Sequence, residues 1–149
     1  MTTVIHTVGP NDTIDKVRQL ILTENIHHVP VVNKKNEFLG IISKVDLELL
    51  KHWGTNYELP VAVKQNKDIF SSTLAKEIMK KCVVSVRKDN SLSYCAELFR
   101  HNYFHSLPVI ENEKLVGIVT TYDLIDFAFC TNKCRAAQSR KKKQLEVVG

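Results

Sequence analysis

The chain has 149 residues, of which 44% are hydrophobic and 25% are charged, and these are the proportions of an ordinary globular domain with a core of its own. No apolar run approaches the roughly 18 residues of a membrane span, and the first residues lack the pattern of a signal peptide, so we expect a cytoplasmic protein. The net charge of +5 belongs to residues 133–149, which hold six basic residues and one acidic residue. Residues 1–132 carry fifteen of each sign, which argues against nucleic-acid binding except through that basic tail.

The first twenty residues predict a short strand followed by a helix. Ile5–Val8 alternate in polarity and stop at Gly9-Pro10, as a strand followed by a turn does. Asn11-Asp12 offer a helix cap. Apolar residues then recur at helical spacing, at Ile14, Val17, Leu20 and Ile21.

A β-hairpin and a second helix are expected next. Two apolar runs, Val29–Val32 and Phe38–Ile42, flank the polar turn Asn33–Glu37. The helix that follows has a broad apolar surface, made by Val45, Leu47, Leu49, Leu50 and Trp53. The predicted order up to this point is β-α-β-β-α.

Residues 54–73 lose the periodicity and are predicted to be a connecting excursion, whereas Leu74–Met79 predict a short helical lead-in. The first pattern then returns, because residues 1–50 are repeated at residues 79–128. The offset between the copies is 78, and it becomes 77 after a turn that is one residue shorter in the second copy. Two units are too few for a solenoid. They suit a pseudo-symmetric pair with ligand-binding clefts at the joint.

One motif occurs at the same place in both copies. The segments GIISKVD and GIVTTYD, ending at Asp46 and Asp123, each place a hydroxyl residue at a helix start and a carboxylate three positions later. The helix N–H groups, joined by the hydroxyl of Ser43 or Thr120, can bind a phosphate. The carboxylate can accept both hydroxyl protons of a ribose. A capping box has the same spacing and would explain these residues by helix stability alone, and the two interpretations are compatible.

A second motif pairs a histidine with a proline inside an apolar run. The segments IHHVPV and FHSLPV begin at Ile26 and Phe104. A proline in a strand favours an edge, where backbone groups stay free for a ligand and an apolar residue can stack on a flat ring. His27 and His105 occupy equivalent positions and can touch phosphate or base, although supporting histidines at the surface would look the same. No carboxylate or cysteine accompanies them at metal-ligand spacing, so no metal is expected.

The remaining residues do not point to catalysis. There is no Ser/His/Asp arrangement and no glycine-rich phosphate loop, so we do not expect an enzyme. Cys130 and Cys134 lie four residues apart, and a disulfide or a metal there stays open beside the simpler interpretation as idle thiols.

Taken together, these motifs resemble a known family. Two β-α-β-β-α copies, each with h-P-V and then G-h-h-(S/T)-x-x-D-(L/I), look like a tandem pair of cystathionine-β-synthase (CBS) domains, a Bateman module. The lead-in AKEIMKKCVVSV is also similar to that family's usual opening segment. The resemblance implies an α+β fold of two motifs packed with pseudo-two-fold symmetry. It divides the chain into a first motif, a connection, a second motif and a basic tail, at residues 1–53, 54–73, 74–129 and 130–149.

The resemblance also implies a function and composite sites. Such modules are non-enzymatic regulators that bind AMP, ADP, ATP or S-adenosylmethionine and signal to an effector protein, which is unidentified here. One site would join Ser43, Lys44 and Asp46 to Phe104 and His105. The other would join Thr120, Thr121 and Asp123 to Ile26 and His27. The first copy lacks the usual lead-in, and no basic residue near the phosphates is evident at a fixed position, although Lys44 or a histidine can serve.

A homodimer is expected through the Leu/Phe-rich second helices, such as Leu124–Phe129. Two alternatives remain. In one, the chain is a structural homodimerisation module in which both aspartates are only caps. In the other, the basic tail docks to nucleic acid or another anionic partner, and salt-dependent binding that disappears on truncation after Asn132 would identify it.

Overall fold

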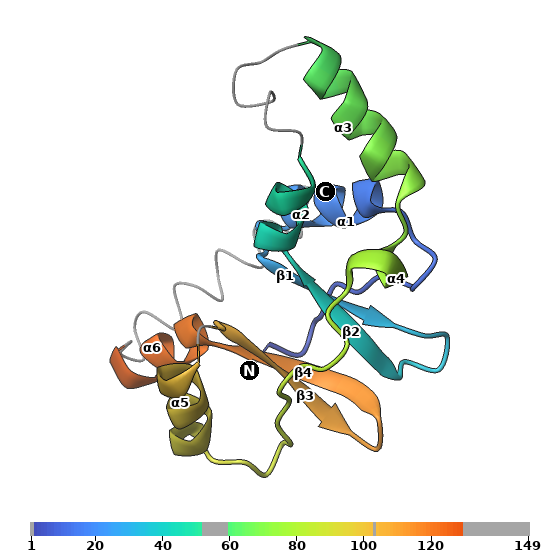
Figure 1. The fold of residues 1–149 in the computed structure, drawn as a ribbon. Helices are drawn as coiled ribbons and strands as arrows, with labels where there is room; N and C mark the ends of the chain where they lie inside the picture. The colour runs from blue at the N-terminus through green and yellow to red at the C-terminus, as the bar shows by residue number, and fades with distance from the viewer. Residues whose placement is uncertain (1, 52–59, 103, 130–149) are drawn as a thin grey trace, which may run out of the picture.

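The computed structural model of the chain describes residues 2–51, 60–102 and 104–129 (Figure 1). Its centre is a pair of antiparallel β-hairpins. One consists of β1 (His28–Val32) and β2 (Phe38–Ser43), and the other of β3 (Ser106–Glu111) and β4 (Lys114–Thr120). Along the chain, each hairpin is preceded and followed by a helix of its own copy, so the predicted α+β fold of two similar units is confirmed.

The helices of the first copy are α1 (Ile14–Thr23) and α2 (Lys44–Leu50), and those of the second are α5 (Leu92–His101) and α6 (Thr121–Phe129). The helical spacing seen in the sequence corresponds to burial, because Ile14, Val17 and Ile21 all face the core. The expected cap of α1 is wrong, since Thr13 is the N-cap residue and its side chain makes no capping bond. The Asp12 carboxylate instead accepts the Gly9 N–H at 2.7 Å.

The strand expected at Ile5–Val8 does not form. Only Val8 pairs, in a parallel bridge with Val31, and Val86 pairs with Val109 in the same way. The Val8 N–H donates to the Pro30 carbonyl at 3.1 Å, so the outer edge of β1 is covered. The prolines therefore do not mark a free edge in either copy, because the Pro108 carbonyl likewise accepts the Val86 N–H at 2.9 Å.

The opening residues of each copy cross over to the sheet of the other. Thr2 pairs with Ile118 on β4 through N–H···O bonds of 3.0 and 3.1 Å, and Lys80 pairs with Ile41 on β2 through two bonds of 3.0 Å. A methyl group at Gly40 would stand 2.6 Å from the Lys80 carbonyl oxygen, so the close approach on β2 requires a glycine. The two copies are intertwined by this exchange.

The two hairpin turns meet around the pseudo-two-fold axis. The Phe38 N–H donates to the Glu113 carbonyl at 2.9 Å, and the Leu115 N–H donates to the Asn36 carbonyl at 3.1 Å. Phe38 and Leu115 are equivalent positions, as are Asn36 and Glu113, so the two bonds exchange under the symmetry of the repeat. The predicted pseudo-two-fold packing is therefore present in the main chain.

Part of the expected connecting excursion is a helix. The segment Pro60–Ser72 forms α3, whose Phe70 and Asn66 are buried, and the Arg18 guanidinium of α1 lies 6.0 Å from the centre of the Phe70 ring. The predicted helical lead-in is confirmed as α4 (Ala75–Ile78). Residues 52–59 and the tail 130–149, with Trp53, Cys130 and Cys134, lie outside the described residues.

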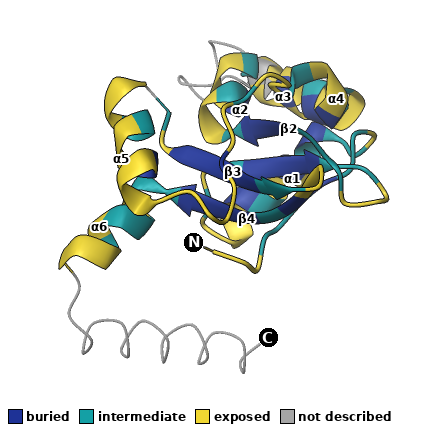
Figure 2. Ribbon diagram, turned by 90° about the horizontal axis from the view of Figure 1, so that it is seen from below, coloured by how far each residue is buried: buried dark blue, intermediate teal, exposed yellow. Residues whose placement is uncertain are grey.

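The core consists of two clusters, one for each copy, on the strands and the helix faces turned toward them (Figure 2). Leu47 of α2 is buried in the first cluster, while Leu50 packs against the first and Leu124 of α6 against the second. These leucines, which were expected to lie in a dimer interface, therefore stabilise their own copy. Within the described residues, no helix is both long enough and apolar enough to cross a membrane.

Candidate functional site

A cleft of about 1000 Å³ lies between the two copies. Its walls come from the starts of α2 and α6, from the end of β2, from the starts of β1 and β3 with the residues just before them, and from Lys80, Val83 and Val84 after α4. The volume is at the upper end of the range usual for small-molecule sites. The lining residues are His27, His28, Ile41, Ser43, Lys44, Val45, Asp46, Glu48, Lys80, Val83, Val84, Phe104, His105, Ser106, Thr121, Tyr122 and Ile125.

The structure assembles the two expected composite sites to different degrees. Every residue expected in the first site lines the cleft, namely Ser43, Lys44, Asp46, Phe104 and His105. Of the second set, Thr121 and His27 line it. Ile26 packs against the first core cluster instead, and Thr120 and Asp123 are not among the lining residues.

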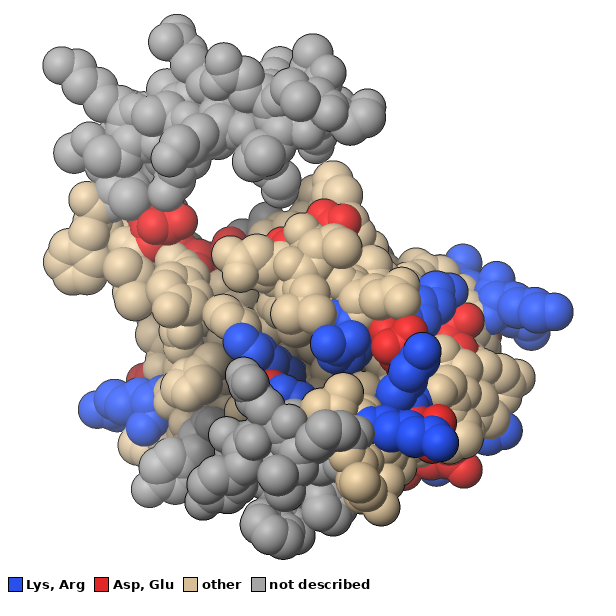
Figure 3. All heavy atoms as spheres, turned by 90° about the horizontal axis from the view of Figure 1, so that it is seen from above, with Lys and Arg blue, Asp and Glu red and all other residues tan. Residues whose placement is uncertain are grey.

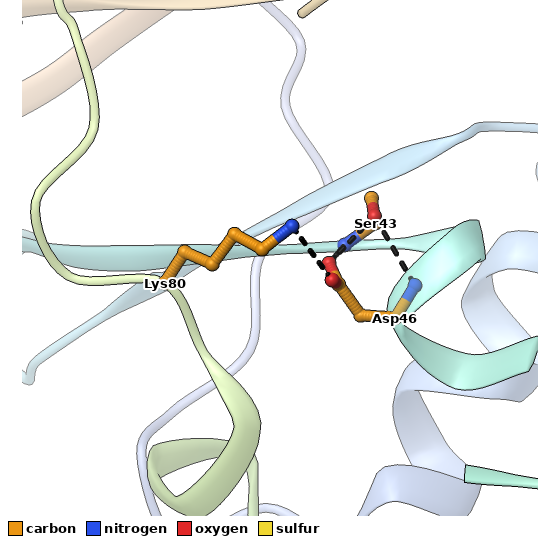
Figure 4. Close-up of polar contacts among 3 residues, drawn as sticks. All are labelled: Ser43, Asp46 and Lys80. Carbon is orange, nitrogen blue, oxygen red and sulfur yellow. Dashed lines mark hydrogen bonds and ion pairs between the residues drawn. The ribbon is translucent and has the colours of Figure 1, made fainter. Parts of the chain in front are cut away.

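Both hydroxyl–carboxylate pairs form capping boxes. Asp46 Oδ2 accepts the Ser43 N–H at 2.8 Å and the Ser43 hydroxyl at 2.5 Å, and the Asp46 N–H donates back to Ser43 Oγ at 3.3 Å (Figure 4). Thr120 and Asp123 repeat these bonds at 2.8, 2.8 and 3.2 Å. The capping interpretation therefore describes both pairs as they stand.

Three backbone N–H groups at each of these helix starts already have acceptors. Besides the capping bonds, the Lys44 N–H donates to the His27 carbonyl at 2.8 Å, and the Thr121 N–H donates to the His105 carbonyl at 3.1 Å. The expected cradle of free N–H groups for a phosphate is thus largely occupied. A phosphate in the cleft would need side-chain cations.

Lys80 provides such a cation, and sequence reasoning missed it. Its Nζ lies 2.8 Å from Asp46 Oδ1, on the carboxylate oxygen that the capping box leaves over (Figure 4). Burial by itself would raise the pKa of Asp46, but the hydrogen bonds from Lys80 and Ser43 outweigh it, and the pKa lies below its ordinary value. The available signal was the repeat, since Lys80 occupies the position of Thr2 immediately after the matched methionine.

Three histidines, His27, His28 and His105, line the cleft between the copies. His28 on β1 is half-buried, and burial lowers its pKa. The neighbouring His27 and His105 and the ammonium of Lys80 lower it further, against the opposite effect of Asp46. His28 is therefore held in its neutral form more firmly than a free histidine.

The apolar part of the cleft suits a flat ring. Phe104 stands edge-on to Phe99, with ring centres 6.2 Å apart and planes at 69°, so its orientation is fixed from behind. Val83 and Val84 of the lead-in and Tyr122 of α6 extend this wall, and the sequence did not single them out.

Charge on the folded part is mixed. On the face seen in Figure 3, basic and acidic side chains are interspersed, next to a broad area that carries neither. Among the described residues, no group of three or more His, Cys, Asp or Glu side chains is arranged to hold a metal ion.

The repeat, the intertwined sheets and the shared cleft are those of a pair of CBS domains. The chain belongs to the CBS domain family, whose model matches residues 1–50 and 75–129. The resemblance stated from the motifs is thereby confirmed.

Among curated proteins, the chain is similar to the CBS domain-containing protein YhcV of Bacillus subtilis. The two are 29% identical over 124 residues, which cover 83% of this chain and 79% of the relative. It also matches an inosine-5'-monophosphate dehydrogenase of Methanocaldococcus jannaschii with 28% identity over 122 residues. The chain spans 21% of the length of that enzyme, so the match concerns one part of it.

Solved structures agree with this fold. A CBS domain of a membrane protein from Sphaerobacter thermophilus matches with a TM-score of 0.70 and 27% identity, covering 82% of this chain and 80% of that one. The CBS-pair protein CBSX2 from Arabidopsis thaliana matches with a TM-score of 0.72 and 23% identity, covering 95% and 93% of the two chains. CBSX2 has also been crystallised in complex with AMP; that structure has a TM-score of 0.70 and 24% identity and covers 86% and 91% of the two chains.

Proposed function

We propose that this chain is a non-enzymatic regulatory module that binds an adenosine-containing ligand in the cleft and signals to a partner protein. The observation that carries the proposal is the composition of the cleft wall. A carboxylate and hydroxyl of the first copy, Asp46 and Ser43, share one cavity with Phe104 and His105 of the second. The AMP complex of CBSX2 supports an adenine nucleotide as the ligand class.

Each part of such a ligand has a suitable partner. The base would lie against Phe104 and the apolar wall, and the ribose hydroxyls would donate to the Asp46 carboxylate. The Asp46 oxygen facing Lys80 is the one outside the capping box, so it is the natural acceptor. AMP, ADP and ATP fit this description, and S-adenosylmethionine shares the adenosine part.

The regulatory step follows from the position of the cleft. A ligand that contacts both copies has a different affinity for each relative placement of the copies, and only such a difference can shift a conformational equilibrium. A partner that reads this placement would receive the signal.

The test is nucleotide-induced thermal stabilisation. A ligand at 100 times its Kd adds about 2.7 kcal/mol, which is a clear rise in melting temperature. The double variant Asp46→Ala/Asp123→Ala should remain folded, at a lower melting temperature because two caps are lost, and should show no such rise. Asp12→Ala is the matched control, because Asp12 also accepts a backbone N–H and a lysine but does not line the cleft.

A double variant that binds adenine nucleotides as tightly as the parent would refute the ribose role. A folded parent that responds to no adenine ligand would refute the proposal itself.

The exposed apolar residues favour a second role in self-association. On α6, Tyr122, Ile125, Phe127 and Phe129 are all exposed, and so are Val45 and Leu49 on α2. We propose that these helices form a homodimer interface, with or without ligand.

A further inference from the structure

The two copies differ in charge at two corresponding positions. Lys80 of the second copy occupies the place that Thr2 has in the first, and Lys44 at the start of α2 occupies the place of Thr121 at the start of α6. Both lysines line the cleft beside Ser43 and Asp46, whereas of the two threonines only Thr121 lines it.

The backbone of Lys80 is fixed while its side chain is not. Both of its main-chain groups are bonded to Ile41, and Gly40 leaves room for this contact. The side chain is 65% exposed, and its ammonium group forms the 2.8 Å ion pair with Asp46. The Asp46 side chain, in contrast, is only 10% exposed, so the ammonium group can change its acceptor when a ligand hydroxyl takes its place at the carboxylate.

Several backbone N–H groups that could meet a phosphate in this half are already engaged. The N–H groups of Ser43, Lys44 and Asp46 have acceptors within the protein. The acidic Glu48 also lines the cleft, but its carboxylate is paired with Lys51 at 2.6 Å. Lys80 is a flexible donor beside the proposed ribose acceptor, and an ammonium on a four-carbon stem is a common phosphate ligand.

We infer that the half of the cleft around Asp46 is selective for phosphorylated adenosine ligands and that Lys80 determines this selectivity. The inference rests on the proposed function and adds to it an asymmetry between the two halves. The ribose takes the Asp46 oxygen, and the ammonium group of Lys80 moves to the phosphate. The equivalent residues around Asp123 have Thr2 and Thr121 in place of the two lysines, and of these three only Thr121 lines the cleft, so they offer no such ammonium group.

Calorimetric titration of the whole chain with adenosine and with AMP tests the inference. Lys80→Ala should weaken AMP binding about tenfold, equivalent to about 1.4 kcal/mol. Adenosine binding should remain within about twofold or become tighter, because the variant frees the Asp46 oxygen. Lys80→Arg should keep the preference for AMP. Lys16→Ala is the control, since Lys16 is an exposed lysine that holds the Asp12 carboxylate at 2.9 Å outside the cleft.

The repeat provides a control at the equivalent position. Thr2→Lys in the Lys80→Ala background should not restore the preference for AMP, because neither Thr2 nor Asp123 lines the cleft. Because the substituted side chains are exposed, circular dichroism and melting temperature should confirm folded proteins.

Three results would overturn the inference. Equal losses for adenosine and AMP would make Lys80 a structural support, tighter binding of both would make it a competitor for Asp46, and no change would remove it from the site. A wild-type chain that binds neither these two compounds nor any other adenine ligand would instead refute the proposed function, so the two failures are distinguishable.

Discussion

Gly40 illustrates how one residue without a side chain holds the two copies together. A methyl group there would lie 2.6 Å from the Lys80 carbonyl and 3.2 Å from the Met79 side chain. We expect Gly40→Ala to lower the free energy of unfolding by about 1–3 kcal/mol, because the main chain of Lys80 must move away from β2. Urea denaturation measures this. Gly9→Ala is the control, since its methyl group would meet nothing closer than the Asp12 carboxylate at 3.6 Å, and equal effects of the two substitutions would contradict the argument.

His28 gives the molecule a dependence on pH. Its pKa in the folded protein lies below the ordinary value of 6.5, so the unfolded chain binds more protons as the pH falls through 6.5. The stability contributed by neutral His28 is therefore complete above pH 6.5 and declines below it. We expect denaturant unfolding of the wild type to show this decline in the free energy of unfolding as the pH falls from neutral. The measurement should stay well above pH 3.8, because Asp12 and Asp46 would begin to contribute near that value.

Ser106, the equivalent of His28 in the second copy, suggests the matching variant. His28→Ser should flatten the profile over the same interval, because the titrating imidazole is gone while His27, His105, Asp46 and Lys80 remain. An unchanged slope would assign the pH dependence to another group.

The spacing of residues in the sequence predicted contacts between residues that are close in the chain. The pairs Ser43–Asp46 and Thr120–Asp123 lie three positions apart on one helical turn, so their mutual bonds could be foreseen. Lys80 could not, because it reaches Asp46 only after its backbone has crossed to the other copy. The hydrophobic periodicity of the sequence does not predict that crossing.

At the scale of elements, α3 shows why a helix can escape prediction. Few of its described residues are buried, and Phe70 with the neighbouring Asn66 leaves only a weak apolar stripe in the sequence. The prediction of a strand at Ile5–Val8 was wrong for the opposite reason: the alternating pattern is present in the sequence, but only Val8 of these residues pairs with another strand. The hairpins were foreseen because each apolar run is buried and each turn is polar.

Phe70 should nevertheless matter for stability. It is 4% exposed and lies beside α1, so we expect Phe70→Ala to cost about 3–5 kcal/mol in the free energy of unfolding. Val63→Ala on the same helix is the control, since Val63 is 52% exposed and should change stability by less than about 0.5 kcal/mol. A small effect of Phe70→Ala in chemical denaturation would mean that α3 is not part of the cooperative core.

For the whole molecule, we expect a homodimer. Phe127 and Phe129, which were expected at the interface, remain exposed on α6, whereas Leu47, Leu50 and Leu124 pack inward. Light scattering should report about twice the chain mass of 17.0 kDa. Phe129→Glu should dissociate the dimer, because Phe129 is 82% exposed at the end of α6 and a charge there would be buried in the interface.

Val61→Glu, an exposed position on α3, is the matched substitution away from that surface and should leave the mass unchanged. A wild-type monomer at micromolar concentration would contradict the dimer, and dissociation by both substitutions would place the interface elsewhere.

The reciprocal crossing has a consequence for specialisation. An isolated first copy would leave the β2 edge at Ile41 unpaired and its own first residues without a strand to pair with. Two identical copies on separate chains would restore both pairings by exchanging their first residues. Such an assembly would contain the same kind of cleft, but every substitution in it would appear twice. With both copies on one polypeptide, equivalent positions can hold different residues, such as Thr2 and Lys80, or His28 and Ser106. Fusion is what allows the two halves to acquire different ligand preferences independently.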